Sequence, residues 1–245
     1  FLFDNFPKGT GFPALAAPPV KEDLPLSPVQ AFSIDDSATT EIDDALSVQG
    51  LGSGTVQFGI HIAAPGLAFG ADSPLDKLAR ERLSTVYMPG WKLTMLPDEV
   101  VQAYTLTEGR DCPAVSVYFT FDEATLELRA ADTRLERVPI VANLRHDRLD
   151  AVVTEEALLG TAPAGYDFAP ELAFAFRLAQ QLKARREVVR GKPENFNRPD
   201  YNFRLSGNDG NEPRGDEPVQ ISTRQRGAPL DLIVAEAMIL ANSHW

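Results

Sequence analysis

Residues 32–46 read Phe-Ser-Ile-Asp-Asp-Ser-Ala-Thr-Thr-Glu-Ile-Asp-Asp-Ala-Leu, which sets five carboxylates between two apolar, strand-like flanks. Like charges packed this closely repel one another, and the repulsion grows as solvent is removed. A partly buried cluster of this composition therefore needs a cation or raised pKa values. A hard divalent ion is the economical answer, because magnesium takes oxygen ligands and completes its shell with waters and a substrate phosphate.

The spacing of the acids predicts a bend in the chain. In an extended strand, Glu41 and Asp43 would share one face and Asp44 would point to the other. One strand cannot present all three to a single ion, so we expect Asp35 to return from the end of the preceding strand. The small and hydroxyl residues at 37–40 favour a tight loop.

Two other interpretations of this cluster stay open from the residues alone. The first is an exposed acidic turn, the commoner form of an isolated cluster of this size. The second is a calcium loop of the EF-hand type, which has a glycine at its sixth position and oxygen ligands at alternate positions. This segment has neither the glycine nor the spacing. The residues favour a metal site over an acidic turn by a small margin.

The periodicity of apolar residues predicts a sheet with helices around it. Alternation of apolar and polar residues predicts strands over 56–62, 115–121 and 126–130. Helical spacing predicts helices over 75–83, 171–190 and 230–241. We assign the arginines at the end of 171–190 to interaction with the helix dipole, and residues 206–215 to a flexible surface loop.

The chain divides into a lead-in and one domain. Residues 1–30 contain six prolines and read as a proline-rich linker, and we place the domain at 31–245. The first residue is not methionine, and the last follows a helical pattern, so we treat the chain as a piece of a longer protein. We find no apolar run of about 18 residues and no secretory signal, which argues against a membrane span. The single cysteine, Cys112, excludes an internal disulfide and fits a cytoplasmic location.

The net charge of −12 argues against indiscriminate binding to nucleic acid, because phosphate contacts come from Lys and Arg. A local channel or a bound cation can still supply positive potential that the total charge conceals.

Four segments in order resemble the RNB catalytic domain of the ribonuclease II family. Asp35 is followed by a five-residue gap, then Glu41 and the pair Asp43-Asp44, as in the family's signature. The other three are Gly59–Ala63, the run from Leu75-Asp76 through Tyr87-Met-Pro to Met-Leu-Pro97, and Arg198–Phe203 with the helix that carries Glu236. The resemblance covers about residues 31–245.

This resemblance implies a mixed α+β fold with a central mixed sheet surrounded by helices, incomplete in this chain. It implies hydrolysis of single-stranded RNA from the 3′ end with release of nucleoside 5′-monophosphates, using Mg²⁺ or alternatively Mn²⁺. It further implies OB-type RNA-binding domains in a longer chain and an arginine motif beyond Trp245. The chain alone is therefore expected to bind metal yet to cleave slowly or not at all.

Individual residues carry over from the family by position. Asp35, Asp43 and Asp44 match the metal-site aspartates, and Glu41 stands where an aspartate is usual. Asp35 and Asp44 would hold the ion, while Asp43 would orient the leaving 3′-oxygen or a second ion.

Further positions match RNA contacts. Tyr87, Phe203 and His146 match positions where aromatic rings lie against RNA, and Glu236 would support the site from behind the metal ligands. Each has a plainer alternative: a packed turn for Tyr87, a strand core residue for Phe203, a solvated helix residue for His146, and an interrupted apolar face for Glu236.

Two residues that differ from the family pattern, and the net charge, each suggest a rival function. Glu41, together with Ala64 in place of a common acid, would fit an inactive RNB relative that binds RNA or a protein. The charge of −12 would fit a divalent-metal-binding domain that does not act on nucleic acid.

Overall fold

A computed structural model describes the chain except for residues 1–5, 7–9, 14–22, 195–198, 208–214 and 226. The chain forms two compact units. Unit 1 comprises Phe1–Lys21, Pro65–Tyr104 and Arg198–Gln225. Unit 2 comprises Glu22–Ala64, Thr105–Asn197 and Arg226–Trp245.

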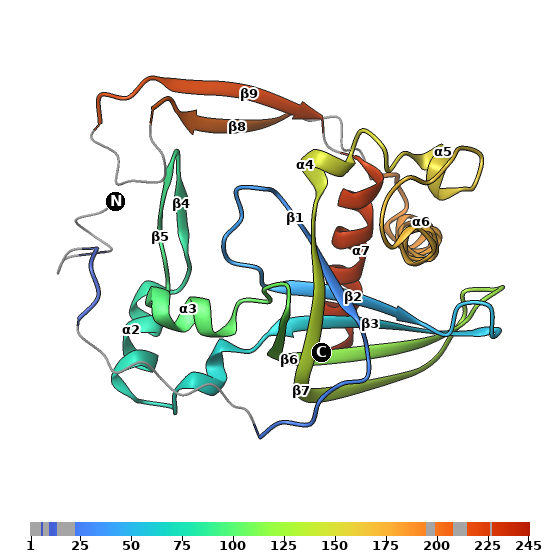
Figure 1. The fold of residues 1–245 in the computed structure, drawn as a ribbon, viewed down its shortest axis with the longest axis horizontal. Coiled ribbons are helices and arrows are strands. Elements are labelled where there is room, and N and C mark those ends of the chain that lie inside the picture. Colours follow the sequence, from blue (N-terminus) through green and yellow to red (C-terminus); the bar gives the residue numbers. More distant parts are fainter. Residues whose placement is uncertain (1–5, 7–9, 14–22, 195–198, 208–214, 226) are drawn as a thin grey trace. The chain divides into compact units, whose positions relative to one another are not determined.

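The centre of unit 2 is a closed barrel of five strands (Figure 1). In barrel order these are β1 (Ala31–Asp35), β2 (Asp44–Gln49), β3 (Thr55–Ala63), β6 (Arg110–Asp122) and β7 (Leu128–Arg145). Neighbouring strands run antiparallel except β1 and β7, which close the barrel in parallel. The predicted mixed sheet within a mixed α+β fold is therefore confirmed.

Helices complete unit 2. They are α4 (His146–Leu149), α5 (Glu155–Leu158), α6 (Ala169–Arg190) and α7 (Pro229–His244). Helix α6 ends at Gly191, whose φ of 72° is a left-handed conformation that glycine adopts without strain. The helices predicted over 171–190 and 230–241 are thus confirmed.

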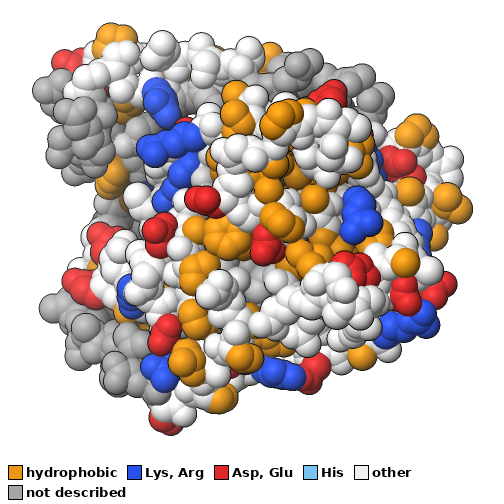
Figure 2. Space-filling view, turned by 45° about the vertical axis from the view of Figure 1, so that its right-hand side comes forward, with side chains coloured by type: hydrophobic (Ala, Val, Ile, Leu, Met, Phe, Trp, Pro, Cys, Tyr) orange, Lys and Arg blue, Asp and Glu red, His pale blue; other side chains and the backbone are white. Residues whose placement is uncertain are grey.

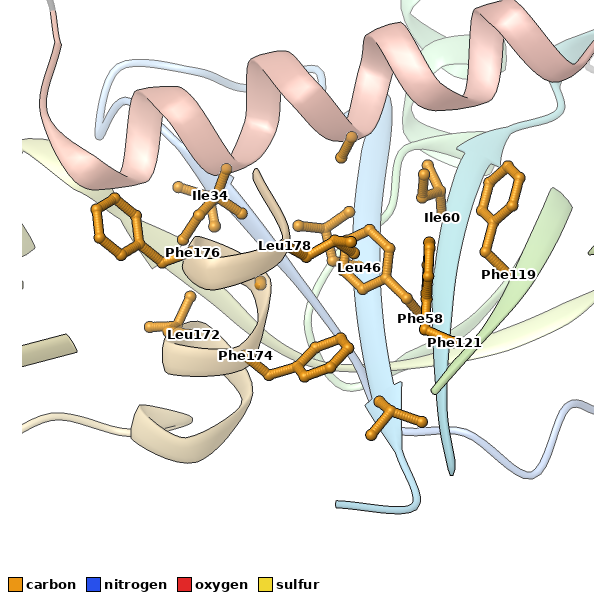
Figure 3. Close-up of a cluster of buried hydrophobic side chains, with 14 of the residues drawn as sticks. Ile34, Leu46, Phe58, Ile60, Phe119, Phe121, Leu172, Phe174, Phe176 and Leu178 are labelled. Carbon is orange, nitrogen blue, oxygen red and sulfur yellow. The ribbon is translucent and has the colours of Figure 1, made fainter. Parts of the chain in front are cut away.

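The main apolar core of unit 2 lies between the barrel and helices α6 and α7 (Figure 3). Alternate residues of the strands face it, including Phe58, Phe119 and Phe121, and α6 contributes Leu172 and Phe176. Removing each of these large side chains from water contributes about 1.5–3 kcal/mol. The period-two pattern predicted this face correctly, because β3 and β6 span residues 56–62 and 115–121.

The opposite face of the same strands carries a buried polar group. Each ring nitrogen of His61 forms one hydrogen bond, Nε2 with Ser47 Oγ at 2.9 Å and Nδ1 with Ser116 Oγ at 2.8 Å. All three side chains are almost completely buried. Burial lowers the pKa of His61 to about 3, so the ring stays neutral. A Cβ at Gly59 would overlap Ser47 Oγ, so this position requires glycine.

The proline-rich lead-in has a defined partner at its end. Arg137 N donates to Pro25 O at 2.9 Å, and Ser27 N donates to Arg137 O at 2.8 Å. Ser27 Oγ also lies 2.7 Å from Tyr118 Oη. The described end of the lead-in is therefore held against β7.

Unit 1 contains short elements. They are the 3₁₀ helix η1 (Pro65–Ala68), α2 (Pro74–Arg82), β4 (Val86–Met88), β5 (Trp91–Leu93), α3 (Asp98–Tyr104), β8 (Pro199–Leu205) and β9 (Val219–Gln225). The predicted helix over 75–83 is α2. Pro74 lies in its first turn, where proline is tolerated. Ser73 caps the helix, because Ser73 Oγ accepts a hydrogen bond from Asp76 N at 3.2 Å.

Other expectations need adjustment. The predicted partner strand at 126–130 starts only at Leu128, because Leu126 has a φ of 54° in the preceding turn. Strand β7 then continues to Arg145. Residues 208–214 of the predicted loop lie outside the described residues. No described helix is both long and apolar enough to cross a membrane.

Candidate metal centre

The acidic cluster occupies the connection between β1 and β2. Strand β1 ends at Asp35, and β2 begins at Asp44. Phe32 pairs with Leu46 in antiparallel register, so both aspartates lie at the same end of this strand pair. The connection bends as predicted: Ala38 N donates to Asp36 Oδ1 at 2.8 Å, and Thr39 N donates to Asp36 O at 2.9 Å.

Asp44 is a largely buried carboxyl group that lies close to two other aspartates. Burial, with a smaller contribution from the negative charges of Asp35 and Asp43, raises its pKa to about 7. Burial also raises the pKa of Asp35, opposed by the hydrogen bond from Ser33 and by the positive charges of Arg145 and His146. The charges of Asp35 and Asp43 therefore disfavour the ionised form of Asp44, which a bound cation would reverse. An all-oxygen donor set in this condition fits a hard divalent cation.

Strand alternation limits how these aspartates meet. Asp35 lies on the same face of β1 as Ser33, whereas Asp44 lies on the face of β2 that carries Leu46. Among the described residues, no metal-sized group contains Asp35, Asp43 and Asp44. Their assignment as metal ligands stays a prediction.

A second acidic group does have metal-sized spacing. Asp36, His146 and Asp147 offer ligand atoms that all lie within 4.8 Å of one another. The parallel pairing of Asp35 with Arg145 explains this, because the residues after each strand leave the barrel at the same edge. An Asp/His/Asp group of this kind could hold a divalent cation, and the arrangement does not identify the ion.

His146 is largely enclosed by this group. Its side chain is 14% exposed, with Nε2 3.9 Å from Asp36 Oδ2 and Nδ1 3.8 Å from Asp150 Oδ2. The His146 ring therefore lies among carboxylates, and it is less exposed to solvent than the alternative of a solvated helix residue predicts. Its contact with RNA stays a prediction.

Tyr87 and Phe203 both lie in unit 1 and are exposed. Tyr87, on β4, is 70% exposed, and Phe203, on β8, is 49% exposed. A Cβ on Gly90 would lie 2.8 Å from the Leu205 side chain, so the β4–β5 turn approaches β8. Rings this exposed do not serve as core residues, and their stacking on RNA stays a prediction.

A family model for the RNB domain matches residues 24–245. The chain belongs to the RNB domain family. The curated protein Exoribonuclease 2 of Edwardsiella piscicida is 32% identical over 229 residues, which cover 91% of this chain and 32% of that protein. The chain thus spans about a third of the length of this relative.

Solved structures share the fold of this RNB domain. Mycoplasma genitalium RNase R in complex with ribose-methylated single-stranded RNA matches with a TM-score of 0.70 at 15% identity, covering 91% of this chain and 33% of that one. Yeast Ssd1, described as a pseudonuclease, matches with a TM-score of 0.60 at 22% identity, covering 75% of this chain and 22% of that one. The same fold therefore occurs with and without nuclease activity.

Glu41, the glutamate where the resemblance leads us to expect an aspartate, precedes Ile42, whose backbone is held by two hydrogen bonds. Thr105 Oγ1 accepts a hydrogen bond from Ile42 N at 2.7 Å, and Leu106 N donates to Ile42 O at 2.9 Å. The segment that carries Glu41 is thus fixed from one side by the residues that precede β6. Its role in the site stays a prediction.

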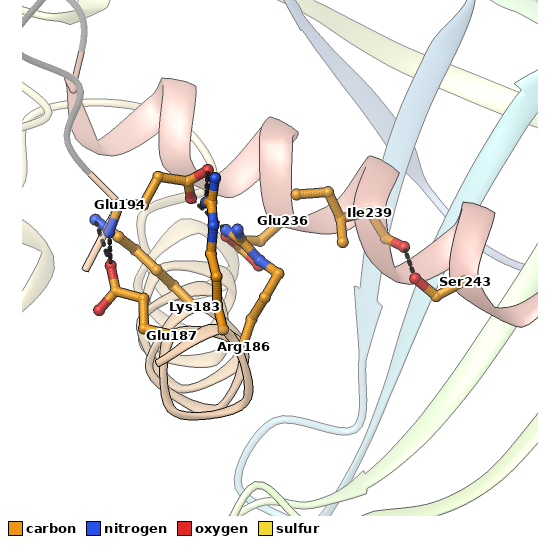
Figure 4. Close-up of polar contacts among 8 residues, drawn as sticks. Lys183, Arg186, Glu187, Glu194, Glu236, Ile239 and Ser243 are labelled. Carbon is orange, nitrogen blue, oxygen red and sulfur yellow. Dashed lines mark hydrogen bonds and ion pairs between the residues drawn. The ribbon is translucent and has the colours of Figure 1, made fainter. Parts of the chain in front are cut away.

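Glu236 lies on α7 and faces α6 (Figure 4). It is 2% exposed and forms an ion pair with Arg186, which also pairs with Glu194 at 2.6 Å. Arg190 pairs with Glu194 at 3.1 Å. Two of the arginines that we assigned to the helix dipole therefore make specific ion pairs, and Glu236 joins two helices whatever else it supports.

Several residues around the RNB site were missed from the sequence. Ser33 lies two residues before Asp35 on β1, and only the pairing of β1 with β7 brings Asn143 and Arg145 to the acidic loop. Asp36 was visible in the cluster but has no counterpart in the family signature. The His146-Asp147 pair next to an arginine was the one local signal that could have indicated a charged site.

Proposed function

We propose that this RNB domain is part of a hydrolytic 3′→5′ exoribonuclease that acts on single-stranded RNA and releases nucleoside 5′-monophosphates. The observation that carries the proposal is the largely buried carboxyl of Asp44, whose pKa is raised to about 7 first by burial and then by the negative charges of Asp35 and Asp43. The name of the E. piscicida relative and the single-stranded RNA bound to RNase R support the choice of reaction and substrate.

The aspartates would hold one or two divalent ions, Mg²⁺ or alternatively Mn²⁺. When bound, such an ion activates water and stabilises the charge that develops on the phosphate. Asp35 and Asp44 would hold the ion, and Asp44 would give up its proton on binding. Asp43, which is exposed and immediately precedes β2, would orient the leaving 3′-oxygen or a second ion.

RNA would be held largely through its bases. Stacking on an aromatic ring is worth about 1–3 kcal/mol per base and tolerates every base, as a processive enzyme requires. Tyr87 and Phe203 are exposed rings suited to this. On the face shown in Figure 2, acidic and apolar side chains are interspersed, and Lys and Arg form small separate groups. OB-type domains elsewhere in a longer chain would add basic surface.

An inactive RNB domain that binds RNA or a protein is the second candidate. The observations that favour it are the likeness to the pseudonuclease Ssd1 and the glutamate at position 41. A third candidate, a metal-binding domain that does not bind nucleic acid, draws on the net charge of −12.

One experiment separates these functions. The purified full-length protein that contains this domain is incubated with 3′-labelled single-stranded RNA, with Mg²⁺ or with excess chelator, and released mononucleotides are resolved by chromatography. Magnesium-dependent release supports the exoribonuclease. RNA binding without release would indicate the inactive relative, and metal binding without RNA binding would indicate the third candidate.

A further inference from the structure

The carboxylate of Asp35 is held by a short chain of polar groups, of which Ser33 is fully buried and Asn143 half-buried. Ser33 Oγ donates to Asp35 Oδ2 at 2.6 Å, and Ser33 itself is 0% exposed. Asn143 Nδ2 lies 3.0 Å from Ser33 Oγ. The parallel register of β1 and β7 pairs Ser33 with Asn143, so the barrel closure itself builds this contact.

The orientation of the Asn143 amide is fixed by its other partners. Asn143 Oδ1 accepts from Glu108 N at 2.9 Å, and Asn143 Nδ2 donates to Leu106 O at 3.0 Å. A carbonyl can only accept and a backbone N–H can only donate, so the reversed amide would lose both bonds. The remaining hydrogen of Nδ2 therefore points to Ser33 Oγ.

This orientation determines the direction of the next hydrogen bond. A serine hydroxyl has a single hydrogen. Since Ser33 Oγ already accepts from Asn143, its own hydrogen is directed to Asp35 Oδ2. The bond favours the ionised carboxylate, in agreement with its lowering effect on the pKa of Asp35.

The segment Thr105–Glu108 holds Asn143 in place through hydrogen bonds with Leu106 and Glu108. Glu108 Oε2 accepts from Asn143 N at 3.1 Å, in addition to the bond that Glu108 N donates to the side chain. The same segment holds Ile42 through Thr105 and Leu106. Both sides of the acidic loop are thereby fixed by one piece of backbone.

We infer that Ser33 and Asn143 are positioning residues for Asp35, with Asn143 setting the direction of the serine hydrogen bond that holds one carboxylate oxygen. This inference rests on the proposed function, in which Asp35 is a metal ligand. Groups that orient metal ligands typically change metal affinity or activity by about 10–100-fold when they are replaced.

Mn²⁺ binding to the purified protein tests the inference without RNA. The electron paramagnetic resonance signal of free Mn²⁺ gives the affinity of wild type, Ser33→Ala and Asn143→Asp. The aspartate variant keeps the volume of Asn143 but can only accept, so it competes with Asp35 for the serine hydrogen. Ser116→Ala is the matched control, because Ser116 is an equally buried hydroxyl that bonds to His61.

The expected result is a loss of Mn²⁺ affinity of about tenfold in Ser33→Ala and Asn143→Asp, and little change in Ser116→Ala. Excess Mn²⁺ should then restore RNA hydrolysis in the two variants. Wild-type affinity in Asn143→Asp, or an equal loss in Ser116→Ala, would overturn the inference. If Ser33→Ala does not fold, Asn143→Asp decides alone.

The same titration separates this inference from the proposed function. A wild-type protein that binds Mn²⁺ but releases no nucleotides contradicts the exoribonuclease. The shift in affinity between variants would still support the role of Ser33 and Asn143. A wild-type protein that binds no Mn²⁺ contradicts both.

Discussion

Asp35 on β1 lies opposite Arg145 on β7 in the parallel pair that closes the barrel. Arg145 Nη1 donates to Asp36 O at 2.9 Å and to Thr39 O at 3.4 Å, so the guanidinium holds the backbone of the acidic loop. Burial raises the pKa of Asp35, and the positive charge of Arg145 opposes that rise. One residue thus supports both the shape of the loop and the charge of its first aspartate.

Replacing Arg145 by Gln should loosen the loop. Hydrogen bonds that involve a charged group contribute about 1.5–3 kcal/mol, so we expect a loss of this order in the free energy of unfolding, together with weaker Mg²⁺ binding. Urea denaturation and metal titration measure the two effects. Arg148→Gln, an exposed change on α4, is the control. Equal behaviour of the two variants would contradict the role of Arg145.

Asp44→Asn should abolish the release of mononucleotides and leave RNA binding largely intact. The amide cannot supply the negative charge that a divalent cation requires, while Tyr87 and Phe203 remain unchanged. Release from labelled RNA and fluorescence anisotropy measure the two properties. Unchanged turnover would remove the mechanism proposed for this domain.

His61 should make the protein sensitive to acid. Its pKa in the folded protein, about 3, lies below the ordinary value of 6.5. The unfolded chain therefore gains a proton first as the pH falls, and stability that is complete above pH 6.5 is lost progressively toward pH 3. The loss is on the order of 5 kcal/mol at most. The hydrogen-bond partners of this ring are the neutral hydroxyls of Ser47 and Ser116. The difference between wild type and His61→Gln in denaturation at several pH values therefore isolates the contribution of the ring. A difference that does not change with pH would refute this assignment.

Replacing Arg186 and replacing Glu236 should lower the free energy of unfolding by different amounts, although both changes remove the same ion pair. Arg186→Met leaves the carboxylate of Glu236 buried and uncompensated, which typically costs about 3–5 kcal/mol. Glu236→Gln costs less, because Arg186 is more exposed and keeps Glu194 as a partner. Thermal denaturation of both variants checks the order. A greater loss in Glu236→Gln would show that this reading of the pair is wrong.

Tyr87→Ala and Phe203→Ala should each weaken binding of single-stranded RNA by about 1–3 kcal/mol. Melting temperatures should change little, because both rings are exposed. Ile221→Ala is a matched control, since Ile221 is 59% exposed and pairs with Phe203 across the β8–β9 ribbon. If the Ile221 variant binds RNA as weakly as the Phe203 variant, general apolar contact and not stacking accounts for the effect.

Local patterns in the sequence predicted the elements well. Alternation identified β3 and β6, and helical spacing identified α2, α6 and α7, because each signal is contained in one short segment. Barrel closure could not be predicted, since it pairs residues such as Ser33 and Asn143 that are 110 positions apart.

The candidate site was predictable only in part. The acidic residues stand in one recognisable motif, and family resemblance supplied their proposed roles. Ser33, Asn143 and Arg145 have no local signal, because their importance depends on the register between β1 and β7. Similarly, nothing near His146 in the sequence indicated its approach to Asp36. The cytoplasmic location stays a prediction that cell fractionation would test.

Closure of the five-stranded barrel has a further consequence for handling the protein. A sheet that joins its first strand to its last presents no free backbone edge to a neighbouring molecule, whereas a two-stranded ribbon retains both of its edges. The ribbon of β8 and β9 also exposes Tyr201, Phe203, Val219 and Ile221. Self-association on concentration or heating should therefore begin at this ribbon, and lysines introduced there would improve solubility without touching the barrel.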